Sequence, residues 1–214
     1  STSRRQRQMC IRDSKDTARF FSKIFRVYCG GTFFVASFLI LTCKIITKVL
    51  VADAYFDSWQ YVPVLIISTV FSCLVNFLAS IYMAEKKNIM AMVTALTGAV
   101  TNVVLNLILI PRMGANGAAV ATACAFVVVF LTRSRDTRRF IKINYQPVVL
   151  TCQTVVLVAQ TVAALCLQGM WFYVAEGLLF ALMLGMNWYQ VVELYKLVTT
   201  KMLSKLKKPK TEEE

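Results

Sequence analysis

Long apolar stretches alternate along the chain with short segments that carry charge, proline or glycine. The hydrocarbon core of a bilayer is about 30 Å thick, so a helix of about 20 apolar residues crosses it. The run 143–175 is too long for one such helix and is divided at Gln168-Gly169. The pattern therefore predicts an all-α bundle of about six transmembrane helices, at residues 27–50, 61–84, 88–110, 114–132, 147–167 and 171–192.

Composition supports the membrane class. Of 214 residues, 57% are hydrophobic and 16% are charged, and the mean hydropathy of +0.61 leaves too little polar surface for a soluble domain. A formal net charge of +13 usually indicates a nucleic-acid or anionic-lipid partner. Here the basic residues form short clusters between apolar stretches, as in cytoplasmic loops of membrane proteins. We therefore expect no nucleic-acid partner.

Charge and hydropathy divide the chain into four parts. A basic segment, residues 1–23, precedes four spans in residues 24–142, two further spans in residues 143–192, and a basic tail, residues 193–214. The first fourteen residues, STSRRQRQMCIRDS, look like the translation of sequencing-adapter DNA. In that case native sequence begins near Lys15 and an upstream part is missing. The alternative interpretation is an ordinary basic cytoplasmic segment.

Segments rich in lysine and arginine alternate along the chain with segments that carry few or none, so the basic residues collect at one end of the predicted helices. They precede the first helix, recur at Lys86 and Lys87 and in the predicted loop 133–146, and fill the tail. The loop 52–60, by contrast, carries two aspartates and no basic residue. Because cytoplasmic loops are enriched in lysine and arginine, both termini are predicted to be cytoplasmic. The even number of helices agrees with this orientation.

The most distinctive segment, residues 98–126, is a pair of predicted helices rich in small residues. Glycine and alanine spaced four residues apart let transmembrane helices approach closely. Two asparagines, also four residues apart, are suited to hydrogen bonds with a neighbouring helix, each worth about 1 kcal/mol at most. We interpret this hairpin first as a packing element, with positions Asn102, Asn106, Pro111, Gly114, Gly117, Ala118, Ala121 and Thr122.

The order of these residues resembles the C-terminal region of polysaccharide flippases. The pattern is Asn-x-x-x-Asn, then Leu-Ile-Pro, then Gly-x-x-Gly-Ala-Ala-x-Ala-Thr, ending at Thr122. An acidic-aromatic segment at 54–57 and Val62-Pro63-Val64 at the start of the second helix also look like the family. These O-antigen (Wzx-type) flippases share a superfamily with MATE multidrug exporters and lipid II flippases. The resemblance covers residues 24–139, and only hydropathy extends it to the last two helices.

The resemblance implies a fold, a cargo and a location. Such proteins have about 12–14 helices in two lobes around a central cavity, so this chain would be the C-terminal portion, without the N-terminal lobe. The implied function is to move an undecaprenyl-pyrophosphate-linked oligosaccharide across the bacterial cytoplasmic (inner) membrane during surface-polysaccharide and lipopolysaccharide biosynthesis. The implied partners are the lipid-linked oligosaccharide and the missing N-terminal lobe.

Two lysines within the first predicted helix are candidates for binding that cargo. Lys44 and Lys48 lie four residues apart on one face, and a lysine at mid-bilayer costs about 2.5–3.5 kcal/mol. At about 1.5 Å per residue, Lys44 lies about 26 Å from Val27, near the outer boundary. Two interpretations stay open. Either the ammonium groups snorkel to the interface, or they face a cavity and bind the pyrophosphate headgroup.

Glu176 is the only acid well inside a predicted span. If it is withdrawn from water, it is a candidate site for a coupling proton or cation. The alternative is an interfacial acid near the start of the sixth helix, where the helix dipole favours negative charge.

The remaining features favour transport over catalysis. The sequence has no nucleophile–base pair, phosphate loop or metal-ligand spacing, so we predict no enzyme activity, catalytic residue, metal or cofactor. The basic run 196–210 is predicted to lie on anionic membrane lipid or to be a solvated tail. Two other functions stay open, a MATE-like multidrug/cation antiporter and a polytopic enzyme of polysaccharide assembly. An enzyme of that kind is expected to have a large loop outside the cytoplasm with clustered charged residues. The longest such predicted loop, 52–60, is too short for that, which argues against the enzyme.

Overall fold

The computed structural model describes residues 2–50, 52, 58–139, 141, 143–167 and 169–206, and within them the chain is helical apart from short connections. Each helix contains a segment long and apolar enough to cross a membrane. The prediction of an all-α bundle of six such helices is therefore confirmed. The helices are α1 (Thr2–Leu50), α2 (Val62–Ala84), α3 (Asn88–Met113), α4 (Ala115–Thr137), α5 (Pro147–Cys166) and α6 (Met170–Leu206).

Several helices run beyond their predicted ends. The basic segment 2–23 continues the first span as part of α1, and α6 extends to Leu206, through about two thirds of the predicted basic tail. Helix α3 continues through Pro111 for two residues, until Gly114 ends it with a left-handed φ of 57° that glycine adopts readily. The acidic-aromatic segment 54–57, with Asp53, and the last residues of the tail lie outside the described residues.

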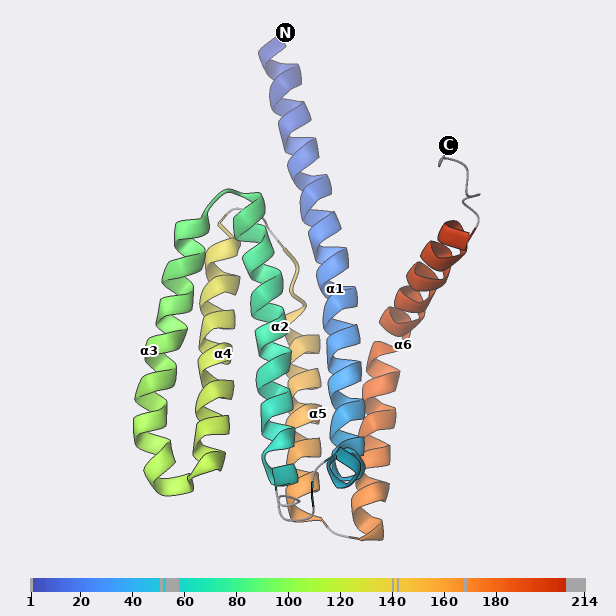
Figure 1. The fold of residues 1–214 in the computed structure, drawn as a ribbon. Coiled ribbons are helices and arrows are strands. Elements are labelled where there is room, and N and C mark those ends of the chain that lie inside the picture. Colours follow the sequence, from blue (N-terminus) through green and yellow to red (C-terminus); the bar gives the residue numbers. More distant parts are fainter. Residues whose placement is uncertain are drawn as a thin grey trace, which may run out of the picture.

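The helices form two neighbouring groups (Figure 1). Helices α2, α3 and α4 pack together on one side, and α1, α5 and α6 pack on the other, with α1 also contacting α2. The start of α1, the end of α6 and the α2–α3 and α4–α5 connections lie toward the same end of the bundle. That end, here the basic end, carries Lys86, Lys87, Arg138 and Arg139. Its assignment to the cytoplasm stays a prediction.

The core is built from apolar stripes at helical spacing. Phe33 and Ile40 of α1 belong to one buried cluster together with Leu74 and Leu78 of α2 and Leu157 of α5. Helix α3 is different, because Thr94 and Gly98 are its only buried residues. Its outer face is apolar, as expected of a surface in contact with hydrocarbon chains or further helices.

Glycine brings α3 and α4 into close contact. A Cβ atom on Gly117 would lie 2.4 Å from the carbonyl oxygen of Leu109, so only glycine allows this approach. Ala121 is fully buried in α4. Asn102 donates a hydrogen bond to Thr122 Oγ1 at 3.3 Å, across the two helices. Asn106 instead donates to Asn102 Oδ1 at 2.8 Å, along its own helix. The second asparagine therefore orients the first and does not reach the neighbouring helix.

Candidate intramembrane polar site

Three fully buried polar side chains join α1, α5 and α6 within the membrane-spanning region. Ser37 Oγ donates a hydrogen bond to Gln160 Oε1 at 2.7 Å, and Gln160 Nε2 donates to Glu176 Oε2 at 3.0 Å. The exposed fraction of each side chain is 0%. The other carboxylate oxygen of Glu176, Oε1, is buried without a hydrogen-bond partner. Glu176 thus has one fixed oxygen and one that can accept a proton or coordinate a small cation.

The positions of these groups follow from the apolar stripes that carry them. Ser37 lies between Phe33 and Ile40 on the buried face of α1, and Gln160 lies between Leu157 and Ala164 on that of α5. Glu176 is four residues after the fully buried Phe172. Packing of these stripes therefore draws the polar groups together. Burying them unpaired would be costly, and the hydrogen bonds offset part of that cost.

Lys44 lies at the end of this site farther from the basic end. Its Nζ atom lies 3.4 Å from the carbonyl oxygen of Leu167, 3.8 Å from the ring centroid of Phe172 and 4.4 Å from that of Trp59. The ammonium group interacts electrostatically with Glu176, without a direct ion pair between them. Lys44 is therefore held by aromatic faces and a carbonyl, in the arrangement of a cation–π site.

The structure does not bring Lys48 into this site. Lys44 is half-buried and Lys48 is exposed, although they are only one turn apart. The α5–α6 connection and the residues before α2 cover the first lysine and not the second. The predicted pair of headgroup ligands is therefore separated into one candidate, Lys44, and one exposed surface lysine.

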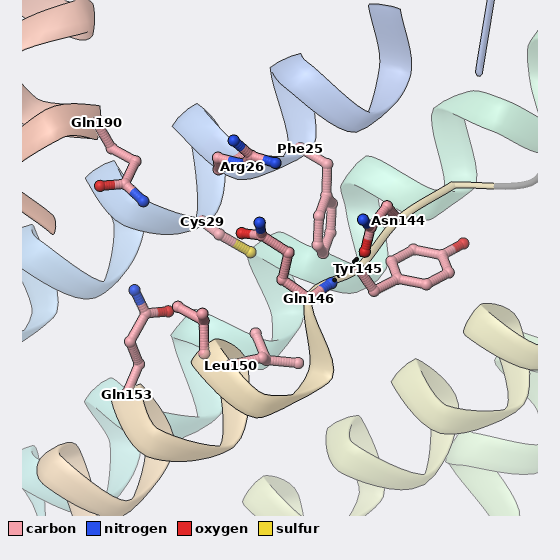
Figure 2. A pocket seen from close by; sticks show the side chains of 10 residues that line it. Phe25, Arg26, Cys29, Asn144, Tyr145, Gln146, Leu150, Gln153 and Gln190 are labelled. Atoms are coloured by element: carbon pink, nitrogen blue, oxygen red, sulfur yellow. Dashed lines mark hydrogen bonds between the residues drawn. The ribbon is translucent and has the colours of Figure 1, made fainter. Parts of the chain in front are cut away.

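A second set of amides continues the site toward the basic end. Gln153 Nε2 donates a hydrogen bond to Asn187 Oδ1 at 2.6 Å, and Asn187 Nδ2 donates to the carbonyl oxygen of Met183 at 2.9 Å. Figure 2 shows Gln153, Gln190 and Cys29 around a cavity of about 20 Å³, room for about one water molecule. Gln190 Oε1 is buried without a hydrogen-bond partner.

Together these residues form a buried polar line between α1, α5 and α6. We use this name for Lys44, Glu176, Gln160, Ser37, Asn187, Gln153 and Gln190. Along α6 the line extends from Glu176 to Gln190, which is about 21 Å at 1.5 Å per residue. The polar side chains are thus spread over about 21 Å of this interface, with the fully buried Met183 between Glu176 and Asn187.

Sequence reasoning assigned Arg133 to a loop, and this was wrong. Helix α4 extends to Thr137, and the exposed fraction of Arg133 is only 5%. Its guanidinium donates to Thr94 Oγ1 at 2.9 Å, to the Val75 carbonyl at 2.9 Å and to the Ala91 carbonyl at 3.0 Å. The available signal was spacing, because Arg133 lies four residues after the buried Val129 and eight after Ala125.

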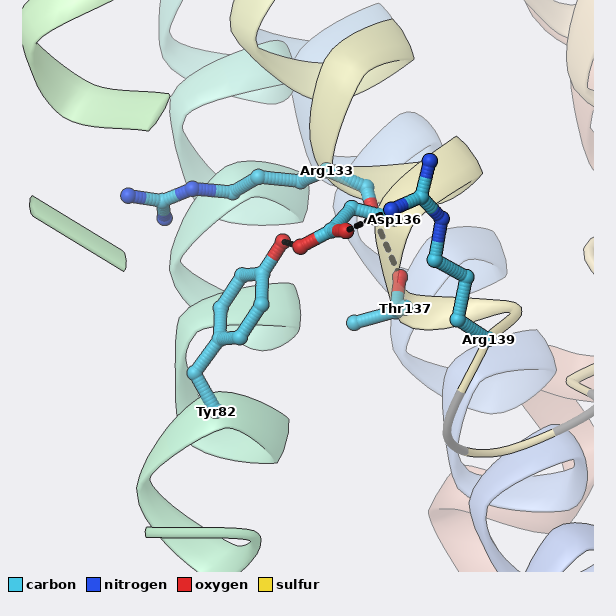
Figure 3. A network of polar contacts seen from close by, with 5 residues as sticks. All are labelled: Tyr82, Arg133, Asp136, Thr137 and Arg139. Atoms are coloured by element: carbon cyan, nitrogen blue, oxygen red, sulfur yellow. Dashed lines mark hydrogen bonds and ion pairs between the residues drawn. The ribbon is translucent and has the colours of Figure 1, made fainter. Parts of the chain in front are cut away.

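A network of polar contacts lies next to Arg133 (Figure 3). Tyr82 donates a hydrogen bond to Asp136 Oδ2 at 2.8 Å, and Asp136 pairs with Arg139 at 3.8 Å. Thr137 donates to the Arg133 carbonyl and lies 3.0 Å from the hydroxyl oxygen of Tyr145. Burial raises the pKa of Tyr145, in the loop after α4. The network fixes the end of α4 against α2 and this loop.

Comparison of this chain with family models, with curated proteins and with solved structures found no match. The fold and its six apolar helices are those of a multi-pass α-helical membrane protein.

Proposed function

We propose that this chain is part of a membrane transporter that moves a lipid-linked oligosaccharide across the bacterial cytoplasmic membrane, as polysaccharide flippases do. The proposal that this chain takes part in transport rests on one observation. It is the buried polar line, in which the fully buried Glu176 lies on the same interface as Lys44.

Helix packing alone does not require such a line. Transmembrane helices associate through small residues and close backbone contacts, as α3 and α4 do at Gly117. An ionisable side chain inside a span is costly, and it commonly marks an ion pathway, a proton relay or a substrate site. Glu176 has an unpartnered oxygen and a nearby cation. This arrangement favours a functional role over a purely structural one.

The oligosaccharide cargo is supported by sequence resemblance and by the chemistry of Lys44. The ordered residues from Asn102 to Thr122 resemble the pattern of polysaccharide flippases. Lys44, held between two aromatic rings, presents a positive charge suited to a pyrophosphate group. In this proposal Lys44 contacts the headgroup, and the lobes of the complete transporter rock about a central cavity.

A cation-coupled exporter of the multidrug type is the second candidate, because it would use Glu176 in the same way with a different cargo. The unpartnered Oε1 of Glu176 favours it. The two candidates differ in what crosses the membrane, so a transport measurement with both kinds of cargo separates them.

Reconstitution of the protein made from its complete reading frame tests the proposal. Proteoliposomes would hold a fluorescent undecaprenyl-pyrophosphate oligosaccharide, and a membrane-impermeant quencher would report how much has changed leaflet. We expect faster quenching than in protein-free liposomes. Efflux of a cationic dye without glycolipid movement would replace the flippase with the exporter. Movement of neither cargo, by protein shown to be folded and inserted, would reject both.

A further inference from the structure

A groove beside Arg133 lies apart from the buried polar line. Helix α4 packs against both α2 and α3, which contact each other only weakly. A cavity of about 450 Å³ remains between the three helices. Its lining runs along α4 from Thr122 to Arg133, and along α3 it includes Ala95, Ala99 and Asn102. The volume falls in the range of small-molecule sites.

Arg133 brings to one end of this groove a positive charge that has no ion-pair partner among the described residues. Three of the five guanidinium N–H groups donate to protein oxygens, and the other two make no hydrogen bond within the described part of the chain. The guanidinium carbon also lies 6.0 Å from the centroid of the Tyr82 ring. All three acceptors are neutral. Asp136, the acid one turn along α4, accepts from Tyr82 and pairs with Arg139 instead. In Figure 3 the guanidinium extends away from Asp136. A buried charge of this kind favours an anionic partner.

The depth of Arg133 suits a lipid phosphate. Arg133 lies four residues before the end of α4 at Thr137, about 6 Å along the helix axis. Helix α4 is about as long as the hydrocarbon core is thick, so this position is near the boundary where phosphates lie. From Arg133 the groove extends about 16 Å along α4 to Thr122, toward the middle of the span. Between these two ends its walls are largely alanine, valine and phenylalanine side chains, and Asn76, Asn102 and Thr122 are its uncharged polar residues.

We propose that this groove binds a membrane lipid with an anionic phosphate headgroup. The phosphate accepts hydrogen bonds from the free N–H groups of Arg133, and one hydrocarbon chain follows the groove toward Asn102. Charge complementarity selects the headgroup, and the planar guanidinium is well suited to phosphate oxygens. The apolar walls distinguish a lipid from a free phosphate ion. This site does not depend on the flippase proposal.

Native mass spectrometry of the full chain in detergent tests this inference. The probes are dioleoyl phosphatidic acid, dioleoyl phosphatidylcholine and inorganic phosphate, each titrated separately. We expect one high-affinity adduct with phosphatidic acid, at least about tenfold weaker binding of phosphatidylcholine, and no retained inorganic phosphate. Equal binding of the two lipids would overturn charge selection. Strong binding of inorganic phosphate would show that the site takes a free anion instead.

Two pairs of variants locate the site. Arg133→Gln removes the guanidinium, and Arg135→Gln removes an exposed positive charge from the same helix. The first should weaken phosphatidic acid binding about tenfold or more, because at least one charge-assisted hydrogen bond is lost, and the second less than about twofold. Equal effects would indicate general surface charge and would overturn the inference.

The second pair leaves Arg133 in place, in case its replacement prevents folding. Ala99→Phe fills the groove from α3, and Val100→Phe adds a ring to the neighbouring exposed position, which does not line the groove. Ala99→Phe should abolish the lipid adduct, and Val100→Phe should keep it. A normal adduct with Ala99→Phe would show that the lipid binds elsewhere.

Discussion

Gln160 Nε2 and Glu176 Oε2 lie 3.0 Å apart and join α5 to α6 by a hydrogen bond that is shielded from water. The same glutamine accepts from Ser37, so three helices meet at one amide. Because both functional groups of the amide are engaged, the orientation of Gln160 is fixed. The carboxylate is thereby held with Oε2 bound and Oε1 unpartnered.

This relationship predicts different effects of two substitutions at Glu176. Glu176→Ala leaves the Gln160 amide without its buried acceptor, which costs about 1–3 kcal/mol. Glu176→Gln keeps a carbonyl oxygen in the same place. We expect the alanine variant to lower the Tm in detergent by about 2–4 °C for each kcal/mol lost, and the glutamine variant to lower it much less. Equal melting of the two variants would show that the hydrogen bond does not stabilise the helix junction.

A second prediction separates the two lysines of α1. Lys44 is enclosed by Phe172, Trp59 and the Leu167 carbonyl, whereas Lys48 is exposed. If Lys44 contacts the pyrophosphate, Lys44→Ala should reduce glycolipid movement about tenfold, the loss of one charge-assisted contact. Lys48→Ala should change it less than twofold. Both variants are compared by the quenching assay at equal membrane protein level, and equal rates for both would remove Lys44 from the headgroup role.

The number and order of the helices were predictable from hydropathy, because each span is a long apolar run. Helix ends were less predictable. Charged residues were taken to end a helix at Thr132, but three of the five guanidinium N–H groups of Arg133 find acceptors inside the bundle, and α4 continues to Thr137. From the sequence one can estimate the free-energy cost of burying the Arg133 charge. The sequence does not show which hydrogen-bond acceptors on neighbouring helices will offset that cost.

The candidate site was only partly predictable for a related reason. Glu176, Lys44, Gln153 and Gln160 stand out as polar residues in apolar runs. Their alignment between α1, α5 and α6 depends on which helix faces meet, and that is set by packing over the whole bundle. Ser37 and Asn187 carried no signal of their own, because small polar residues are common in membrane helices.

A third prediction concerns the contact between α3 and α4. Gly117→Ala places a Cβ atom 2.4 Å from the Leu109 carbonyl oxygen, which belongs to a helix backbone and cannot move alone. The helices must separate, at a cost of about 1–3 kcal/mol. Gly185→Ala is the matched control, because nothing lies within 4 Å of its added Cβ. Thermal unfolding in detergent should show a lower Tm for the first variant only, and an unchanged Tm there would disprove the close approach.

The fourth prediction concerns the contact between α2 and α4 at the basic end. Tyr82 is fully buried, and its hydroxyl donates to Asp136 Oδ2 at 2.8 Å. Tyr82→Phe removes the donor and leaves the carboxylate with Arg139 at 3.8 Å. Hydrogen bonds to charged groups contribute about 1.5–3 kcal/mol, and partial access of water to Asp136 places the expected loss near the lower value.

Tyr28→Phe provides the comparison for this measurement. The Tyr28 hydroxyl donates to the Cys73 carbonyl at 3.3 Å from an exposed position, so its loss should cost less than about 1 kcal/mol. Both variants remove one oxygen atom from a tyrosine that faces another helix. Tyr82→Phe should therefore lower the Tm by several degrees more than Tyr28→Phe, since the Asp136 contact fixes the end of α4 that also carries Arg133. If Tyr28→Phe is the more harmful change, the Tyr82–Asp136 hydrogen bond is not what holds these two helices together.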